Sequence, residues 1–187
     1  MYAMMRSENR RRRLAVRKQE DHVAKVLEFR GRSRRQPASG SIPGLKADAS
    51  TAMDLVEAKQ TWQNILRVQR AWFEKIDRES AERFPMLHFR WHPALHGPED
   101  WWVVPDWVFR SLKEAGNWKF VMIVETERKS VGIRESEVLK VRAEAAKRGG
   151  EALISLRWVR WKRGKPVVEV WWIIPEPVFL DLLRDAG

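Results

Sequence analysis

Three charged residues near the middle of the chain have the types and spacing needed for phosphate chemistry. Glu57 and Lys59 are two positions apart in a segment that we expect to be a strand, so their side chains leave the same face. Asp48 lies shortly upstream, where a neighbouring strand could place it beside them. Two carboxylates can hold Mg²⁺, and a lysine can orient or deprotonate water and offset charge on a pentacovalent phosphate. We therefore interpret these residues as a nuclease site.

This short pattern is weak by itself, because 33% of the chain is charged and such combinations arise freely. The alternative interpretation is a solvated strand edge. The context favours a site, since Leu55 and Val56 place the charged pair beside a buried strand, where unneeded ions are costly. The sequence contains no phosphate-binding loop with Walker spacing and no dinucleotide fingerprint, so we expect no nucleotide cofactor.

The composition indicates a nucleic-acid partner. The 187 residues carry a net charge of +11, and residues 1–35 hold eight of these surplus charges. Such an excess is typical of proteins that bind many phosphates. The absence of cysteine excludes disulfides, cysteine-bound zinc and a thiol nucleophile. No stretch suits a membrane span or an export signal, so we expect a cytoplasmic protein with no membrane partner.

Hydrophobic spacing predicts the elements that position these residues. Residues 1–13 are polar and end in four arginines, so we expect a disordered basic arm. From Leu14 the spacing predicts an amphipathic helix that ends near Gly31, followed by a mobile loop rich in Pro and Gly. Further elements are expected as strands over 53–59, 86–91 and 101–105 and as helices over 65–83 and 106–112. This alternation indicates an α/β fold.

The second half of the chain repeats the order of the first. Residues 101–109 match residues 171–179 at a shift of 70, and 55–57 match 123–125 at a shift of 68. Several matches in the same order argue against coincidence. We expect a duplicated unit of strand, helix, strand, strand and helix.

Five short motifs follow one another between residues 14 and 115. They are Glu20-x-x-Val23-Ala24, Arg35-x-Pro37-x-Ser39-Gly40, Lys46-Ala47-Asp48, Val56-Glu57-Ala58-Lys59 and, after a helix, Trp102-Val103-Val104-Pro105. In order and spacing, the set resembles archaeal and phage-type Holliday junction resolvases of the PD-(D/E)xK nuclease superfamily. The resemblance implies a restriction-endonuclease-like α/β fold, with a mixed central sheet flanked by helices.

The same resemblance implies an activity and a set of residue roles. It implies a Mg²⁺-dependent endonuclease, with Mn²⁺ able to substitute, that acts as a homodimer and makes paired cuts in four-way DNA junctions. Asp48 and Glu57 would bind the metal, with Glu20 as an additional carboxylate. Lys59 would be the catalytic lysine, and Ser39 would reach the scissile strand. Arg35 would contact phosphate, and charge adds further DNA-binding candidates, namely Arg10, Arg11, Arg12, Arg13, Arg34 and Lys46.

Some positions depart from the family pattern. Ala47 stands where a Gly often precedes the metal-binding Asp, and Gln60 follows the lysine where small or hydroxyl residues are common. The second copy departs further, because Glu127 replaces the lysine and no Asp-bearing strand precedes Glu125. We therefore expect residues 14–116 to be the nuclease core and residues 117–187 to be a degenerate repeat packed on it. A second metal-binding carboxylate cluster is the alternative there.

The histidines admit two interpretations. His88, His92 and His96 recur every four residues, which would align them on a helix for a metal ion. Pro93 and Gly97 argue against a helix there, so we favour a polar surface.

The tryptophans also admit two interpretations. Trp158 and Trp161 are interleaved with basic residues, which suits either base stacking or an ordinary basic hairpin with Gly164 in its turn. The doublets at 101–102 and 171–172 suit packing between the repeats, with one tryptophan of each doublet exposed or in an interface.

Together these observations predict Mg²⁺-assisted hydrolysis of DNA, with four-way junctions as the substrate. The alternatives are a non-catalytic DNA-binding or architectural protein on a nuclease-like scaffold, and a nuclease that acts on other DNA forms. The complete set of Asp48, Glu57 and Lys59 in the first copy favours the enzyme.

Overall fold

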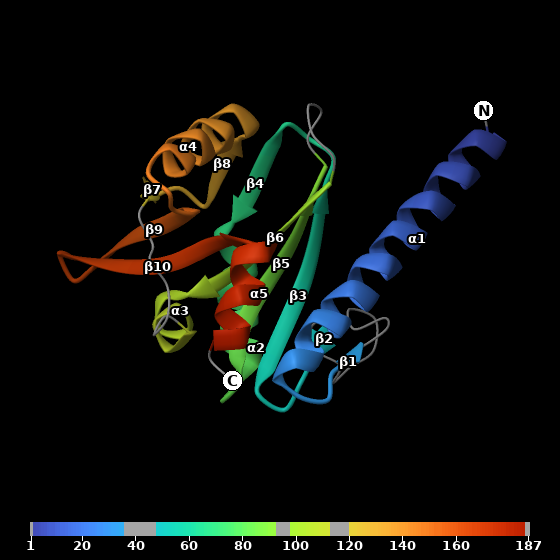
Figure 1. Ribbon diagram of the computed structural model, residues 1–187, viewed down its shortest axis with the longest axis horizontal. Coiled ribbons are helices and arrows are strands. Elements are labelled where there is room, and N and C mark those ends of the chain that lie inside the picture. The colour runs from blue at the N-terminus through green and yellow to red at the C-terminus, as the bar shows by residue number, and fades with distance from the viewer. Residues whose placement is uncertain (1, 36–47, 93–97, 113–119, 186–187) are drawn as a thin grey trace.

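The computed structural model describes residues 2–35, 48–92, 98–112 and 120–185, which form helices and strands in alternation (Figure 1). The helices in these ranges are α1 (Tyr2–Leu27), η1 (Glu28–Arg30, a 3-10 helix), α2 (Arg70–Ser80), α3 (Asp106–Leu112), α4 (Glu135–Lys147) and α5 (Glu176–Asp185). The strands are β1 (Arg34–Arg35), β2 (Ala49–Ser50), β3 (Asp54–Thr61), β4 (Ile65–Gln69), β5 (Phe84–Trp91), β6 (Glu99–Pro105), β7 (Phe120–Thr126), β8 (Ser130–Arg134), β9 (Ala152–Lys162) and β10 (Lys165–Pro175).

A mixed eight-stranded sheet forms the centre of the molecule, in the order β1-β2-β3-β5-β6-β10-β9-β7. Strands β3 and β5 pair in parallel, as do β7 and β9, and the remaining neighbours pair antiparallel. Strands β4 and β8 form a separate antiparallel pair. The predicted α/β class, with a mixed central sheet flanked by helices, is confirmed.

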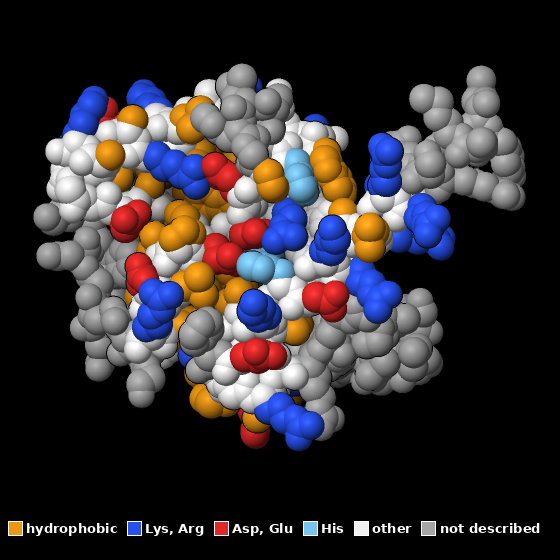
Figure 2. Space-filling model, turned by 45° about the vertical axis from the view of Figure 1, so that its right-hand side comes forward, with side chains coloured by type: hydrophobic (Ala, Val, Ile, Leu, Met, Phe, Trp, Pro, Cys, Tyr) orange, Lys and Arg blue, Asp and Glu red, His pale blue; other side chains and the backbone are white. Residues whose placement is uncertain are grey.

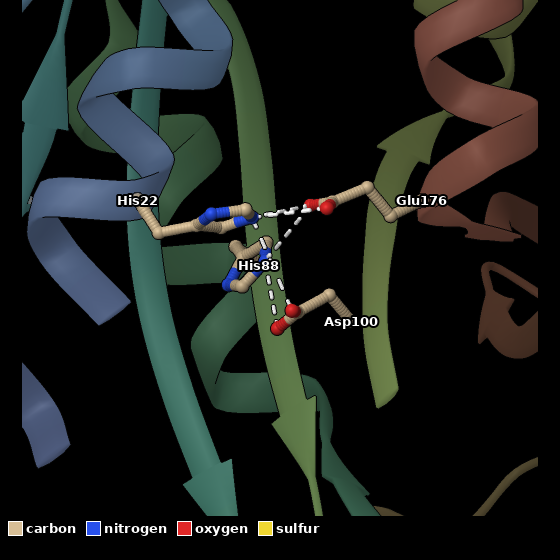
Figure 3. Close-up of side chains that lie close together, drawn as sticks. All are labelled: His22, His88, Asp100 and Glu176. Atoms are coloured by element: carbon tan, nitrogen blue, oxygen red, sulfur yellow. Dashed lines mark hydrogen bonds and ion pairs between the residues drawn. The ribbon is translucent and has the colours of Figure 1, made fainter. Parts of the chain in front are cut away.

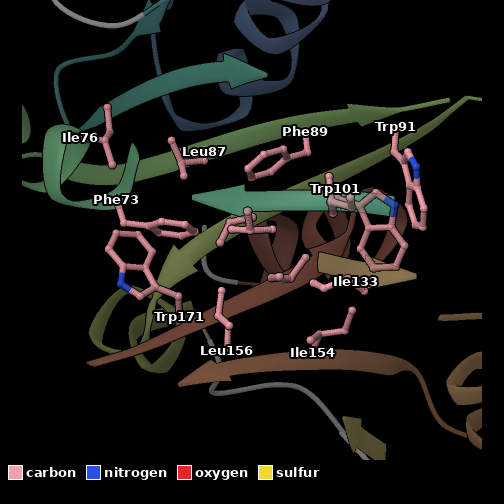
Figure 4. Close-up of a cluster of buried hydrophobic side chains, with 14 of the residues drawn as sticks. Phe73, Ile76, Leu87, Phe89, Trp91, Trp101, Ile133, Ile154, Leu156 and Trp171 are labelled. Carbon is pink, nitrogen blue, oxygen red and sulfur yellow. The ribbon is translucent and has the colours of Figure 1, made fainter. Parts of the chain in front are cut away.

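Helices cover both faces of the sheet, because the buried residues of each strand alternate between two hydrophobic clusters. On one face, α2, α4 and the β4–β8 pair enclose a cluster that includes Leu55, Phe73 and Trp171 (Figure 4). Phe73 contacts the Trp171 ring edge-on, with ring centroids 4.5 Å apart. On the other face, α1, α3 and α5 enclose a cluster that includes Val23 and Val56. Neighbouring residues of β3 therefore point to opposite helix layers.

The element order of the first half recurs in the second. The series β3-β4-α2-β5-β6-α3 is followed by β7-β8-α4-β9-β10-α5, with the same strand directions in each half. The two halves meet where β6 pairs with β10, and there Val103 lies opposite Ile173, its own equivalent at a shift of 70. The halves are thus related by an approximate two-fold axis at this pair. Each unit contains one strand, β4 or β8, beyond those we expected.

Side-chain contacts between the halves obey the same symmetry. The indole nitrogen of Trp102 donates to Oε2 of Glu176 over 3.0 Å, and the indole nitrogen of Trp172 donates to Oδ1 of Asp106 over 2.8 Å. Trp102 and Trp172 are equivalent, and so are Asp106 and Glu176. The doublet tryptophans therefore pack between the halves. Trp101, Trp102 and Trp171 are buried and Trp172 is partly buried, so we find no fully exposed tryptophan in either doublet.

Two expectations about local structure are wrong. The basic arm is helical from Tyr2 instead of disordered, because residues 2–27 contain no glycine or proline and are rich in strong helix formers such as arginine. The helix expected over residues 65–83 begins only at Arg70, and Ile65–Gln69 is strand β4. The apolar spacing of Ile65, Val68 and Trp72 suits a helix, but pairing with β8 decides the structure. Among the described helices, none is long and apolar enough to cross a membrane.

Candidate functional site

Glu57 and Lys59 lie on one face of β3, as their spacing predicts. They share this face with buried Leu55, beneath helix α2. Lys59 Nζ donates to Oε1 of Glu57 over 2.5 Å, and Lys75 Nζ of α2 donates to Oε2 over 2.6 Å. The Glu57 side chain is only 8% exposed, so two ammonium groups balance one nearly buried carboxylate.

Asp48 lies next to this pair, at the start of the neighbouring strand. Its backbone nitrogen donates to the carbonyl oxygen of Val56, and its Oδ2 accepts a hydrogen bond of 2.7 Å from the backbone nitrogen of Ala58. The pairing of β2 with β3 therefore brings Asp48 to the backbone on either side of Glu57. The structure brings together the three residues that spacing alone identifies.

Electrostatics keep Glu57 and Lys75 charged. Burial raises the pKa of Glu57, but hydrogen bonds from Lys59 and Lys75 outweigh it and leave the pKa below its usual value. Burial lowers the pKa of Lys75, but the hydrogen bond to Glu57 and the charges of nearby carboxylates, Asp48 among them, leave it above its usual value. The site therefore contains an ionised Glu57 carboxylate and a protonated Lys75 at neutral pH.

The donor set of this site fits Mg²⁺. Carboxylate oxygens from Asp48 and Glu57 are the hard ligands that this ion prefers. Protein hydrogen bonds hold both carboxylates in place, at Ala58 for Asp48 and at the two lysines for Glu57. An ion bound to Glu57 would replace one of its two lysine contacts. A lysine released in this way would remain beside the ion, where a phosphate could bind.

Sequence reasoning missed Lys75, and no pattern distinguishes it from Arg70 and Arg78 on the same helix. Only the packing of α2 over β3 brings its ammonium to Glu57.

The remaining predicted site residues are less well placed. Glu20 lies on α1, and α1 packs on the face of β3 opposite to Glu57 and Lys59, as the hydrogen bond from Gln60 to the carbonyl of Ala15 indicates. Its role at the metal stays a prediction. Ser39 and Lys46 lie outside the described residues, and so do the side chains of Arg34 and Arg35.

A basic cleft lies at the end of β3, just beyond Lys59 in the chain. Arg11 and Arg12 of α1 line it together with Trp62 and the end of β3, and its volume is about 680 Å³. The side chains of residues 10–13 are exposed, and Trp62 is half-exposed. The cations can contact phosphates, and the exposed indole can stack on bases.

The tryptophans of the predicted basic hairpin have different surroundings. Residues Arg163 and Gly164 both have positive φ in the turn between β9 and β10, as a two-residue hairpin turn requires. Trp158 is fully buried in the core, whereas Trp161 is 63% exposed and donates to Glu127. Of the two, only Trp161 is available for stacking.

The second repeat lacks the charge balance of the first. The pairing register places Met122 and Val124, not Glu125 and Glu127, at the positions that correspond to Glu57 and Lys59, because Met122 pairs with Ile154 and Val124 with Leu156, as Glu57 pairs with Leu87 and Lys59 with Phe89. The expected equivalence is therefore wrong: Glu125 is exposed on the other face of β7, and Glu127 lies beyond the end of this strand. Glu127 accepts a hydrogen bond from Trp161 instead of a cation.

A second group of titratable residues lies on the α1 and α5 side of the sheet (Figure 3). It consists of His22 from α1, His88 from β5, Asp100 from β6 and Glu176 from α5, and we call it the two-histidine cluster. One ligand atom from each of the four residues lies within 4.8 Å of the others, so the cluster could hold a metal ion. On the face shown in Figure 2, histidine side chains lie next to carboxylates, with Lys and Arg side chains around them.

The charges in this cluster are tightly coupled. His22 Nε2 lies 2.9 Å from both carboxylate oxygens of Glu176, and this hydrogen bond raises the pKa of His22. Burial lowers the pKa of His88, which is fully enclosed. Burial raises the pKa of Glu176, but the hydrogen bond from His22 and its other donors outweigh this and leave the pKa well below its usual value.

Our expectation that the histidines form a polar surface is wrong for His88, which lies at a buried position of β5. His92 is partly buried and stacks on Trp62, and His96 lies outside the described residues. The signal was present in the sequence, because the segment Met86-Leu87-His88-Phe89 places a histidine between apolar residues of a buried strand.

Comparison with models of protein families gives no match for this chain, and neither curated proteins nor solved structures match it.

Proposed function

We propose that the protein is a Mg²⁺-dependent endonuclease that hydrolyses DNA phosphodiesters at Asp48, Glu57 and Lys59. One observation carries the proposal. Three residues identified by spacing alone share one site, in which Lys59 contacts the Glu57 carboxylate and Asp48 is bonded to the adjacent backbone.

The residues of the site have distinct tasks in this proposal. Asp48 and Glu57 hold the metal ion, which supplies a Lewis acid for the scissile phosphate and a water of lowered pKa. Lys59 orients the attacking water and, with Lys75, offsets the negative charge that develops on the phosphate. Two ammonium groups already lie within hydrogen-bonding distance of the site carboxylate, so little rearrangement is needed to meet this charge.

The basic surface supports DNA as the substrate. Arg11, Arg12 and Trp62 line a cleft at the end of the strand that carries Glu57 and Lys59. Phosphates contacted there would hold DNA at this end of β3 without any reading of base sequence. The net charge of +11 adds a long-range attraction for any nucleic acid.

The finer assignment, a restriction-endonuclease-like Holliday junction resolvase, rests on the ordered motif set and is part of the proposal. Within the described residues, each chain has one Asp, Glu and Lys set, because Met122 and Val124 occupy the positions of Glu57 and Lys59 in the second repeat. Paired cuts in a four-way junction require two such sets. The proposal therefore includes a homodimer.

Incubation of the full-length protein with a synthetic four-way junction and a matched linear duplex, with and without Mg²⁺, tests the proposal. We expect metal-dependent cuts in the junction and weaker cutting of the duplex. Equal cutting of both substrates would support a nuclease for other DNA forms. Tight binding of both without any cut, in Mg²⁺ or Mn²⁺, would overturn the proposal in favour of an architectural DNA-binding protein.

A further inference from the structure

The two-histidine cluster contains the ligands of a transition-metal site, and the nuclease proposal makes no use of it. Its four side chains come from α1, β5, β6 and α5, so it joins the N-terminal helix and both repeats. It lies on the opposite face of the sheet from Glu57 and Lys59. We propose that the two-histidine cluster binds one Zn²⁺ ion, and that this ion fastens α1 and α5 to the central sheet.

Distances within the cluster match a tetrahedral zinc site. With bonds of about 2.0–2.1 Å, neighbouring ligand atoms of a tetrahedral ion lie about 3.3–3.4 Å apart. His88 Nε2 lies 3.3 Å from an oxygen of Asp100 and 3.6 Å from an oxygen of Glu176. His22 Nε2 lies 2.9 Å from Oε2 of Glu176 and 3.9 Å from Oδ2 of Asp100, whereas His88 lies nearer to Oδ1 of that carboxylate. Each of these four distances is within about half an ångström of the tetrahedral spacing.

One buried nitrogen points into the centre of this arrangement. Nε2 of the fully buried His88 makes no hydrogen bond of good geometry, and its nearest polar atoms are the oxygens of Asp100 and Glu176 at 3.3 and 3.6 Å. The other ring nitrogen, Nδ1, lies 2.9 Å from the side-chain amide of Gln19. Metal binding through Nε2 places the hydrogen on Nδ1, and the Gln19 amide would rotate to accept it, giving up its hydrogen bond to the carbonyl oxygen of Lys59. In exchange, Nε2 of His88 would gain a ligand bond in place of its long contacts to the two carboxylates.

Neighbouring residues hold the two carboxylates in position. Arg90 donates to both oxygens of Asp100, over 2.8 and 2.7 Å, and Trp102 donates to Oε2 of Glu176. Such outer contacts orient ligands and are typical of built metal sites. The second repeat has no equivalent cluster, since Ser155 and Val170 occupy the positions that correspond to His88 and Asp100.

The donor set selects the kind of ion. Two imidazoles and two carboxylates suit Zn²⁺, whereas Mg²⁺ prefers oxygen ligands in an octahedron with several waters. Four protein ligands also close the site, as in structural zinc sites. The partly exposed His22, at 33%, leaves a path for the ion to enter. The expected consequence of binding is stability, because the unfolded chain does not keep the four ligands together.

Isothermal titration calorimetry, in which ZnCl₂ is added to chelator-treated full-length protein, tests this inference. We expect one Zn²⁺ per chain, no binding of Mg²⁺ at this cluster, and a melting temperature raised by about 5–10 °C when free Zn²⁺ exceeds the dissociation constant 100-fold. His22→Ala should reduce the affinity at least tenfold. His92→Ala is the matched control, because His92 lies outside the cluster, and it should bind Zn²⁺ like the wild type.

X-ray absorption of the zinc-loaded wild-type protein gives a second readout that does not depend on the folding of a variant. We expect two imidazole nitrogens and two oxygens at about 2.0–2.1 Å. No Zn²⁺ uptake, or a zinc environment without two imidazoles, would show that the cluster is a metal-free network of ion pairs. Because the readouts are metal binding and stability, failure here leaves the nuclease proposal unaffected, and absence of DNA cutting leaves this one unaffected.

Discussion

Lys75 of α2 and Glu57 of β3 lie 2.6 Å apart, nitrogen to oxygen, and are 18 residues apart in sequence. Their contact links helix α2, which packs through buried Phe73 and Ile76, to the strand that carries the proposed active site. It also gives Glu57 a second cation beside Lys59.

Replacement of Lys59 and of Lys75 by alanine should lower the rate of DNA cutting to different extents. Lys59→Ala should lower the single-turnover rate of DNA cutting by about 10²–10³-fold, the range found when one preorganised donor is removed. Lys75→Ala should lower it by about tenfold, because Lys59 remains. Since Lys75 is 42% exposed, its loss should cost less than about 1 kcal/mol of unfolding free energy. Arg78→Ala, on the same helix, is the control and should leave the rate unchanged. A larger rate effect from Lys75→Ala than from Lys59→Ala would reverse the assigned roles.

The reciprocal indole contacts make a prediction about stability. Trp102 is fully buried and stacks on Phe179 with ring centroids 4.5 Å apart, whereas the equivalent Trp172 is only partly buried and stacks on Phe109 at 4.4 Å. Trp102→Phe should therefore cost about 2–3 kcal/mol and Trp172→Phe about 1 kcal/mol. Urea denaturation in the presence of a chelator measures both. A greater loss from Trp172→Phe would show that the contacts between the halves are not governed by burial.

Arginines 10–13 make a prediction about salt dependence. Their replacement by alanine should weaken binding to junction and duplex alike and flatten the plot of log affinity against log salt by about 0.9 for each lost phosphate contact. Replacement by lysine is the control, because it keeps the charge and should keep the slope. An unchanged slope in the alanine variant would mean that these residues do not contact phosphate. A selective loss of junction binding would show that they recognise DNA shape.

Some of this architecture could be predicted from sequence because the signals are local. The two-residue spacing on an expected strand predicts that Glu57 and Lys59 share a face, and the doublet motifs predict equivalent strands at 101 and 171. Strand β4 could not be predicted in the same way. Its residues suit a helix, and its partner β8 lies 65 positions further along, so only long-range pairing determines its structure.

The two-histidine cluster could not be predicted for a related reason. His22 and Glu176 are 154 residues apart, and they meet only because α1 and α5 pack on the same face of the sheet. A histidine among apolar strand residues indicates that His88 needs a buried partner. It does not indicate which residue will be that partner. The partner is determined by the pairing of β6 with β10, because α5 follows β10 and therefore lies beside the first repeat.

The most direct measurement is the single-turnover cutting rate of two variants of the same kind, Glu57→Gln in the first repeat and Glu125→Gln at an exposed position of β7 in the second. Each removes one negative charge with almost no change in shape, and junction binding measured in parallel controls for folding. The account predicts a loss of about 10³-fold for Glu57→Gln and a change of less than about twofold for Glu125→Gln. Undiminished cutting by Glu57→Gln, with normal junction binding, would contradict it.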